Sequence, residues 1–165
     1  MPKLFVVLIF LGCIAVAVPH LDSLGEAPYA ARTEVAEPSG YGPLSVSLEA
    51  DRRGHFIVDA VINGRTITML ADTGASAVVL TEADARRAGF EPRSLEFDVP
   101  VKTANGESRA AAIRLDSVDI GGIRLDDVRA MVVREGDLDI SLLGMSYIGR
   151  LSSFNMAGGR LELVK

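Results

Sequence analysis

Hydrophobic and polar residues alternate with a period of two along most of the chain after residue 44. Such alternation indicates half-buried β-strands, because successive side chains of a strand point to opposite faces. In the segment HFIVDAVI, every second residue from Phe56 to Ile62 is apolar and falls on one face. The pattern predicts strands at residues 44–50, 55–62, 65–71, 108–120, 123–133 and 160–164.

Glycine-containing dipeptides separate these segments and predict the turns between them. Asn63-Gly64 is the strongest of these signals, since both residue types tolerate a positive φ in a two-residue hairpin. Further turns are expected at Asn105-Gly106, Gly121-Gly122 and Gly158-Gly159.

One segment, TEADARRAG at residues 81–89, has the features of a helix. Thr81 can cap the first turn of this helix, and Asp84 stands three residues later, at the second position of a capping box. Gly89 can end the helix. A second short helix is expected at residues 145–150. The balance predicts a mostly β domain over residues 44–165, a closed or semi-closed barrel with one or two short helices.

The N-terminal part of the chain has a different pattern. Residues 1–18 combine a basic start with an uninterrupted apolar run, which is shorter than the roughly 20 residues of a full membrane span. They predict either a marginal membrane anchor or a secretory signal cleaved after the small residues 15–17. Residues 19–43 are rich in proline, alanine and glycine and have no sustained period, so we expect a flexible linker.

The composition of the chain argues against several kinds of partner and site. The net charge is −5 and the basic residues are scattered, which argues against a nucleic-acid partner. Two histidines and one cysteine are too few for a zinc site or a disulfide framework. We therefore expect no metal and no cofactor.

The stretch MLADTGASAVVL carries one carboxylate, Asp72, in an apolar run. A buried carboxylate is costly unless it is paired, hydrogen-bonded or protonated. Thr73, Gly74 and Ser76 follow it and offer two hydroxyls and a tight turn. This local chemistry makes Asp72 the candidate catalytic residue.

Asp72-Thr73-Gly74, preceded by an apolar strand and followed by Ala75-Ser76, resembles the active-site loop of aspartic peptidases. More narrowly, residues 54–165 resemble the bacterial single-domain, membrane-anchored retropepsin-like aspartic proteases. Three stretches carry the resemblance: MLADTGAS (69–76), TANG (103–106) and LLGMSYIGRL (142–151).

Peptide hydrolysis without a metal or a nucleophilic side chain needs two carboxylates that share one proton, one acting as base and the other as acid. The chain has a single D-T-G, whereas two-lobed relatives carry two copies. The second carboxylate must therefore come from another subunit, which predicts a C2 homodimer with Asp72 of each copy on the axis.

The resemblance implies roles for the residues around Asp72. Thr73 would hydrogen-bond across the dimer axis, Gly74 would donate its N–H to the carboxylate, and Ser76 would donate to its outer oxygen. Ala75 and Ser76 would also contact substrate. Leu142-Leu143-Gly144 matches the structural element that packs under the active loop.

The segment VKTANGESR predicts a hairpin with Asn105-Gly106 at its tip, and the resemblance implies that this hairpin is the flap over the substrate. Thr103, Ala104, Asn105 and Gly106 are its candidate substrate-binding residues. The sequence lacks the glycine-rich flap tip of the viral enzymes and the flap tyrosine of the pepsin-like ones.

Together these features predict an aspartic endopeptidase that acts on polypeptides. The resemblance places it on the bacterial inner membrane with a periplasm-facing domain, or exported if the N-terminal segment is cleaved. The alternative is a non-catalytic retropepsin-like dimer that binds extended peptides or a partner protein. The intact D-T-G favours the enzyme.

Overall fold

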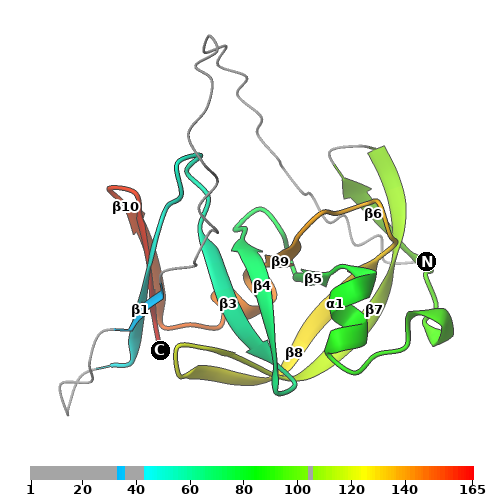
Figure 1. Cartoon of the computed structure of the whole chain (residues 1–165), viewed down its shortest axis with the longest axis horizontal. Helices are drawn as coiled ribbons and strands as arrows, with labels where there is room; N and C mark the ends of the chain where they lie inside the picture. Colours follow the sequence, from blue (N-terminus) through cyan, green and yellow to red (C-terminus); the bar gives the residue numbers. More distant parts are fainter. Residues whose placement is uncertain (1–32, 36–42, 104–105) are drawn as a thin grey trace, which may run out of the picture.

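The computed structural model describes residues 33–35, 43–103 and 106–165, and strands dominate them (Figure 1). The strands are β1 (Thr33–Val35), β2 (Ser45–Glu49), β3 (Ile57–Ile62), β4 (Arg65–Ala71), β5 (Val78–Leu80), β6 (Val99–Thr103), β7 (Gly106–Ile120), β8 (Ile123–Val133), β9 (Ser141–Leu143), β10 (Ser153–Ala157) and β11 (Arg160–Val164). The helices are α1 (Glu82–Arg87) and α2 (Met145–Ile148), and Pro92–Ser94 form a 3-10 turn.

Six of the strands form a closed barrel. The larger sheet has the order β3-β4-β9-β5-β8-β7-β6, and an additional pairing of β3 with β7 joins its two sides. The alternating face of β3 points inward, because Phe56, Val58, Ala60 and Ile62 are all buried. The predicted mostly β barrel is confirmed, and closure removes the exposed edges that an open sheet would leave.

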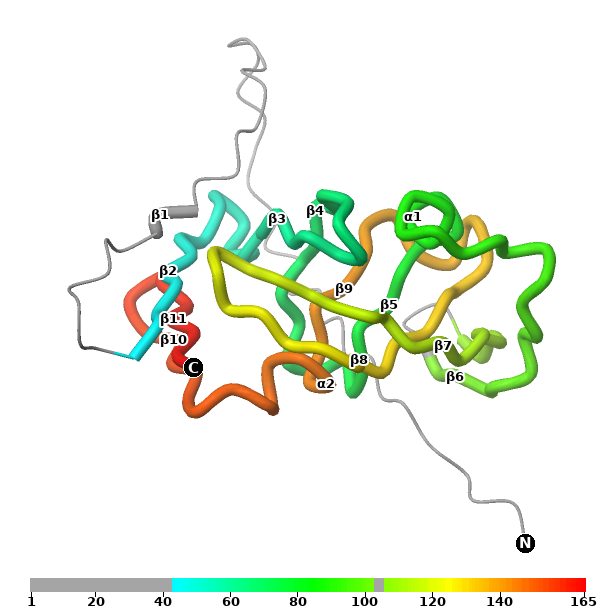
Figure 2. Tube along the Cα trace, turned by 90° about the horizontal axis from the view of Figure 1, so that it is seen from below, coloured from blue at the N-terminus to red at the C-terminus, as the bar shows by residue number. Residues whose placement is uncertain are grey.

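A smaller sheet of order β1-β2-β11-β10 lies at one end of the molecule, and the hairpin of β6 and β7 lies at the other (Figures 1 and 2). β1 falls inside the range that the sequence predicted as a linker, and it pairs with β2. β10 forms one edge of this sheet, and all five of its residues are exposed.

The β3–β4 hairpin turns at the expected dipeptide. Ile62 pairs with Arg65, and the two residues between them have φ of 49° and 80°. Asn63 also joins this hairpin to its neighbours, since its side chain donates to the carbonyl of Ala88 and accepts from the N–H of Ser117. The predicted hairpin is confirmed.

Both predicted helices form. Thr81 caps α1 and accepts the N–H of Asp84 at 3.2 Å, while Gly89 follows the helix with a φ of 95°. α2 begins directly after Gly144 and presents its residues to the core, where Tyr147 is fully buried.

Residues 1–18 lie outside the described residues, as do residues 19–32 and 36–42 of the predicted linker. Within the described ranges, no helix has the length and apolar character needed to cross a membrane.

Candidate active site

Asp72 stands at the point where β4 ends, and a strand from late in the chain fixes its backbone. β9 pairs with β4 in parallel, and Ala71 is the partner of Leu143 in that ladder. The N–H of Asp72 continues the ladder by donating to the carbonyl of Leu143 at 3.0 Å. Since Leu142 and Leu143 are almost fully buried, the loop starts from a rigid base.

The Asp72 carboxylate is half-buried, and its two oxygens differ in environment. Oδ1 accepts the N–H of Gly74 at 2.8 Å, as the resemblance implied. Oδ2 is shielded from solvent and has no hydrogen-bond partner among the described residues. A buried polar oxygen without a partner is costly in a native structure and calls for an explanation.

The predicted hydrogen bond from Ser76 to the outer oxygen of Asp72 is not formed. Ser76 is exposed and instead lines a cavity of about 460 Å³ between the loop, β7 and β8. The local backbone explains the difference, because Ala75 between Gly74 and Ser76 is fully buried and Ser76 follows it on the solvent side.

Thr73 and Gly74 are exposed at the tip of the loop, so the Thr73 side chain is accessible to a second molecule. The loop is held from below at Ala75, whose carbonyl accepts the N–H of Met145 at 2.8 Å. The segment Leu142-Leu143-Gly144 therefore packs under the loop, as the resemblance implied.

Gly144 allows this close packing. A Cβ at this position would meet the carbonyl oxygen of Ala77 and would lie 2.7 Å from that of Ala75. Its φ of −100° is accessible to any residue, so the requirement for glycine comes from space alone. The backbone of α2 can approach the loop only because this side chain is absent.

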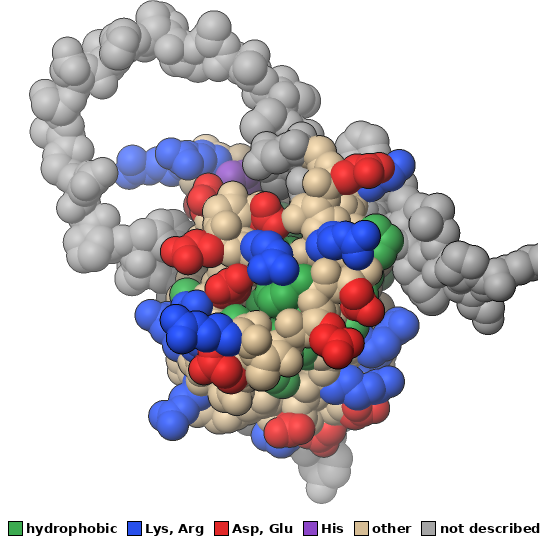
Figure 3. Space-filling model, turned by 90° about the vertical axis from the view of Figure 1, so that its right-hand side faces the viewer, with side chains coloured by type: hydrophobic (Ala, Val, Ile, Leu, Met, Phe, Trp, Pro, Cys, Tyr) green, Lys and Arg blue, Asp and Glu red, His purple; other side chains and the backbone are tan. Residues whose placement is uncertain are grey.

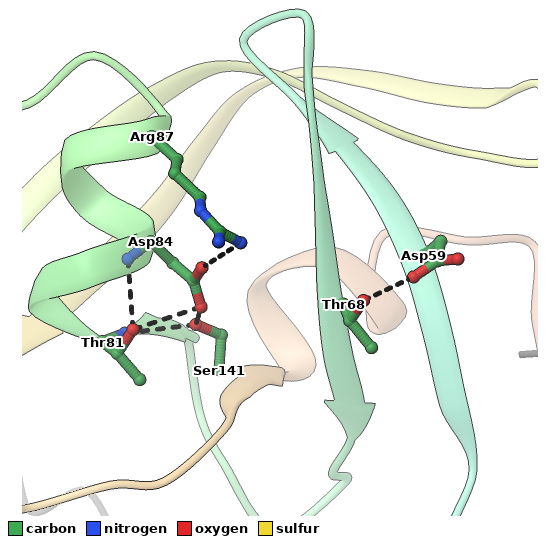
Figure 4. A network of polar contacts seen from close by, with 6 residues as sticks. All are labelled: Asp59, Thr68, Thr81, Asp84, Arg87 and Ser141. Atoms are coloured by element: carbon green, nitrogen blue, oxygen red, sulfur yellow. Dashed lines mark hydrogen bonds and ion pairs between the residues drawn. The ribbon is translucent and has the colours of Figure 1, made fainter. Parts of the chain in front are cut away.

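A partly buried polar network connects β9, which supports the loop, to helix α1 (Figure 4). Ser141 is fully buried, and its hydroxyl donates to Asp84 Oδ2 at 2.6 Å and accepts the N–H of Thr81 at 3.1 Å. Arg87 lies 3.6 Å from the other oxygen of Asp84. The network ties the first residue of β9 to the start of α1.

A second buried hydroxyl, that of Ser146, joins α2 to two strands. Its Oγ accepts the N–H of Val78 at 2.8 Å and donates to the carbonyl of Arg129 at 2.7 Å. Both serines were missed at the level of sequence. The signal was present, since each hydroxyl interrupts an apolar stretch as Asp72 does.

A family of known proteases matches this chain. The model of the "gag-polyprotein putative aspartyl protease" family matches residues 58–150, a range that includes the Asp72 loop and both β9 and α2. The chain belongs to this family of aspartyl proteases.

Relatives support the same assignment. The crystal structure of a retropepsin-like aspartic protease from Rickettsia conorii is 38% identical, with a TM-score of 0.67, and the match covers 82% of this chain and 96% of that one. Two uncharacterized proteins, from Sinorhizobium sp and Rickettsia prowazekii, are 42% and 43% identical over 122 and 115 residues. These matches cover 74% and 70% of this chain. The chain spans about half the length of these two curated relatives, 52% and 48%.

The retropepsin-like fold includes the predicted hairpin. All five residues of β6 pair with the first part of β7, from Val99 with Ala110 to Thr103 with Gly106. Gly106 therefore belongs to strand β7 and closes the ladder, whereas the sequence placed it in the turn. Ala104, Asn105 and the Thr103 side chain lie outside the described residues.

The hairpin end of the molecule carries charged side chains of both signs (Figure 3). Figure 3 shows acidic and basic side chains alternating around a small apolar patch on that side. In the part of the chain that the structure describes, no group of three or more His, Cys, Asp or Glu side chains could hold a metal ion.

Proposed function

We propose that this protein is an aspartic endopeptidase and that its active site forms when Asp72 of two copies meet on a two-fold axis. One observation carries the proposal: Oδ1 of Asp72 is satisfied by Gly74, while the buried Oδ2 has no partner among the described residues. A second carboxyl group that carries a proton would supply the hydrogen that Oδ2 lacks. Family membership supports the proposal independently.

The chemistry follows from two carboxyl groups that share one proton. The ionised carboxylate takes a proton from a bound water as the water oxygen attacks the peptide carbonyl carbon. The protonated carboxyl donates its proton to the carbonyl oxygen, which gives a neutral tetrahedral diol. The C–N bond then breaks as one carboxyl of the dyad protonates the amide nitrogen and the other carboxylate takes a proton from a diol hydroxyl. An acid and an amine are released, and the dyad again holds one proton.

The arrangement around Asp72 suits this role. The N–H of Gly74 holds one carboxylate oxygen in place, and β9 fixes the backbone from below. The carboxylate therefore needs little reorganisation when charge moves, which is how preorganised sites lower a barrier. The β6–β7 hairpin lies beyond the loop as a candidate cover for an extended peptide.

The test is hydrolysis of a mixed peptide library by the wild-type chain and by Asp72→Asn. We expect the variant to lose at least about a hundredfold in activity, since amide replacement removes the group that exchanges the proton. Asp98→Asn is the control, because it makes the same change of charge at an exposed side chain outside the site.

Circular dichroism checks that both variants keep the fold. Cleavage by Asp72→Asn at more than a few percent of the wild-type rate would refute the mechanism. Peptide binding without any cleavage by the wild type would instead favour a non-catalytic binding protein.

A further inference from the structure

Two adjoining cavities lie beside the catalytic loop and share two arginines. The first, of about 460 Å³, is lined by residues of the loop, β7 and β8: Ser76, Ala77, Ala112, Ile113, Arg114, Arg129, Ala130 and Met131. The second, of about 350 Å³, is bounded by Arg114, Asp127, Arg129, Met145, Ser146, Gly149 and Arg150. Because Ser76 and Ala77 directly continue the catalytic loop, the first cavity adjoins the place where a substrate would lie.

Three arginines and one carboxylate surround the second cavity, and only two of the arginine side chains have a partner among the described residues. Arg114 is neutralised by Asp127, with 2.7 Å between Nη1 and Oδ1. Arg150 donates to the backbone carbonyls of Asp126 and Asp127. The guanidinium of Arg129 makes no hydrogen bond or ion pair with any described residue.

The backbone is irregular at Asp127, the residue that pairs with Arg114. Its φ is 56°, a left-handed value that aspartate tolerates better than most residues. The β7–β8 ladder runs continuously on both sides of this point but omits the pair of Asp116 and Asp127. Asp127 therefore departs from regular strand geometry where it pairs with Arg114, and Arg129 keeps an unpaired positive charge.

Arg129 has a fixed relation to the catalytic loop. Its carbonyl accepts the hydroxyl of Ser146, which also receives the N–H of Val78. Val78 begins β5, the strand that follows the loop, and pairs with Ala130. The base of the Arg129 side chain thus cannot shift without disturbing the support of the loop.

The walls of the first cavity suit a particular side chain. Ala112, Ile113 and Met131 provide apolar surface, and Arg129 provides a cation that is free to pair. Glutamate has a short aliphatic stem and an anionic end, which matches an apolar wall with a guanidinium at its margin. Among the described residues, no acidic side chain lines this cavity.

We propose that Arg129 makes this protease select substrates with an acidic side chain, glutamate above all, a few residues from the bond that is cut. The inference rests on the proposed function. An extended peptide advances about 3.3 Å per residue with side chains on alternate faces, so a residue near the cut bond can reach a cavity that adjoins the loop. Because the cavity is open to solvent, the attraction is moderate and weakens at high salt.

The test uses the full chain and pairs of peptides that differ only by glutamate or glutamine at each position around the cleaved bond. We expect the glutamate peptide of the best position to be cut roughly three- to tenfold faster in kcat/KM. The ratio should fall to about one in Arg129→Gln and invert in Arg129→Glu. In the control, Arg93→Gln, the same charge is lost at an exposed residue that lines neither cavity, and the ratio should not change.

Binding of the same peptide pairs to Asp72→Asn, measured by calorimetry, gives a readout that needs no cleavage. Tighter binding of the glutamate peptide that is lost in Asp72→Asn/Arg129→Gln supports the proposal even if hydrolysis fails. Equal cleavage and equal binding of the two peptides by chains that retain Arg129 would overturn it. So would a glutamate preference that survives Arg129→Gln, whether or not the protein is a protease.

Discussion

At the scale of the residue, one physical rule is that a buried polar group needs a hydrogen-bond partner. It applies to the carboxylate of Asp72 and to the hydroxyls of Ser141, Ser146 and Tyr147. Each polar group interrupts an apolar stretch, and each hydroxyl has a hydrogen-bond partner in the structure. Asp72 differs because one of its oxygens lacks a partner among the described residues. The hydroxyl of Ser47 is also buried without a partner among the described residues, so the family match, and not this oxygen alone, marks Asp72 as the candidate catalytic residue.

Tyr147 provides a test of this rule through pH. Its buried hydroxyl donates to the carbonyl of Ile123 at 2.6 Å, and burial, with a further contribution from the charge of Asp119, raises the pKa of its phenol. The folded-state pKa lies above the unfolded value of about 10, so the stabilisation is complete below about pH 10 and is lost as the pH rises further.

We expect Tyr147→Phe to lower the free energy of unfolding by about 1 kcal/mol at pH 7, since a buried hydrogen bond is removed. The difference between wild type and variant should shrink above about pH 10, where only the wild type must keep this phenol protonated. Urea unfolding from pH 7 to 11 measures it. A difference that stays constant over this range would contradict the assignment.

At this scale the sequence predicted the identity of the candidate catalytic residue but not all of its contacts. Asp72 followed from residue types in a short stretch, and the N–H donation by Gly74, which the resemblance implied, is present. The predicted hydrogen bond from Ser76 to Asp72 was wrong, because Ala75 is buried and the next residue, Ser76, therefore faces solvent. Arg129 was not singled out, since its importance depends on which partners the other arginines take.

At the scale of the element, strand β9 is the main support of the loop that carries Asp72. It has only three residues, yet it pairs with β4 in parallel and with β5 in antiparallel orientation and supports the loop between them. Gly144 and α2 follow it immediately, so the spacing between loop and helix depends on the missing side chain at Gly144.

Gly144→Ala tests that spacing. The added methyl group would meet the carbonyl oxygens of Ala75 and Ala77, and we expect a loss of about 3 kcal/mol in stability and of nearly all peptidase activity per folded molecule. Thermal unfolding and activity assays on the folded fraction measure the two effects.

Gly64→Ala is the matched control. Gly64 has a φ of 80°, and no atom lies within 4 Å of the place that an added methyl group would occupy, so only backbone strain of about 1–2 kcal/mol is expected there. Its activity per folded molecule should equal that of the wild type. Full activity in Gly144→Ala would show that the Asp72 loop tolerates a wider separation from helix α2.

The longer strands were predictable from sequence and the short ones were not. β3, β4, β7, β8 and β11 have clear alternation or sharp glycine turns, and the structure confirms them. β5 and β9 are three-residue strands buried at every position, so they have no period to detect. β10 was missed although Phe154 and Met156 alternate along it, because its apolar pattern covers only two residues; all five of its residues are exposed.

At the scale of the whole molecule, a site built from two identical halves makes activity depend on protein concentration. If the second carboxyl group comes from another copy, dilution below the dimer constant removes the site itself. We expect specific activity to fall steeply between micromolar and nanomolar protein, in step with the dimer fraction measured by sedimentation. Constant specific activity in a species shown to be monomeric would refute the shared site.

The mostly β barrel was predictable at this scale from alternation and turn spacing, but its strand order was not, because the short strands β5 and β9 have no period to detect. The two-fold pairing was inferred from the single D-T-G, and it stays a prediction. Residues 1–18 and most of 19–43 lie outside the described residues, so their expected role in tethering or export stays a prediction too.

The position of β9 has a consequence for synthesis. A chain made from its N-terminus completes Asp72 long before Leu143, whose carbonyl holds the Asp72 backbone. Pairings between residues so far apart form late in folding, because the intervening chain must first be confined. A nascent or truncated chain that stops before Ser141 therefore holds Asp72 in an unsupported loop, and under the proposed function we expect such fragments to be unable to cut their neighbours.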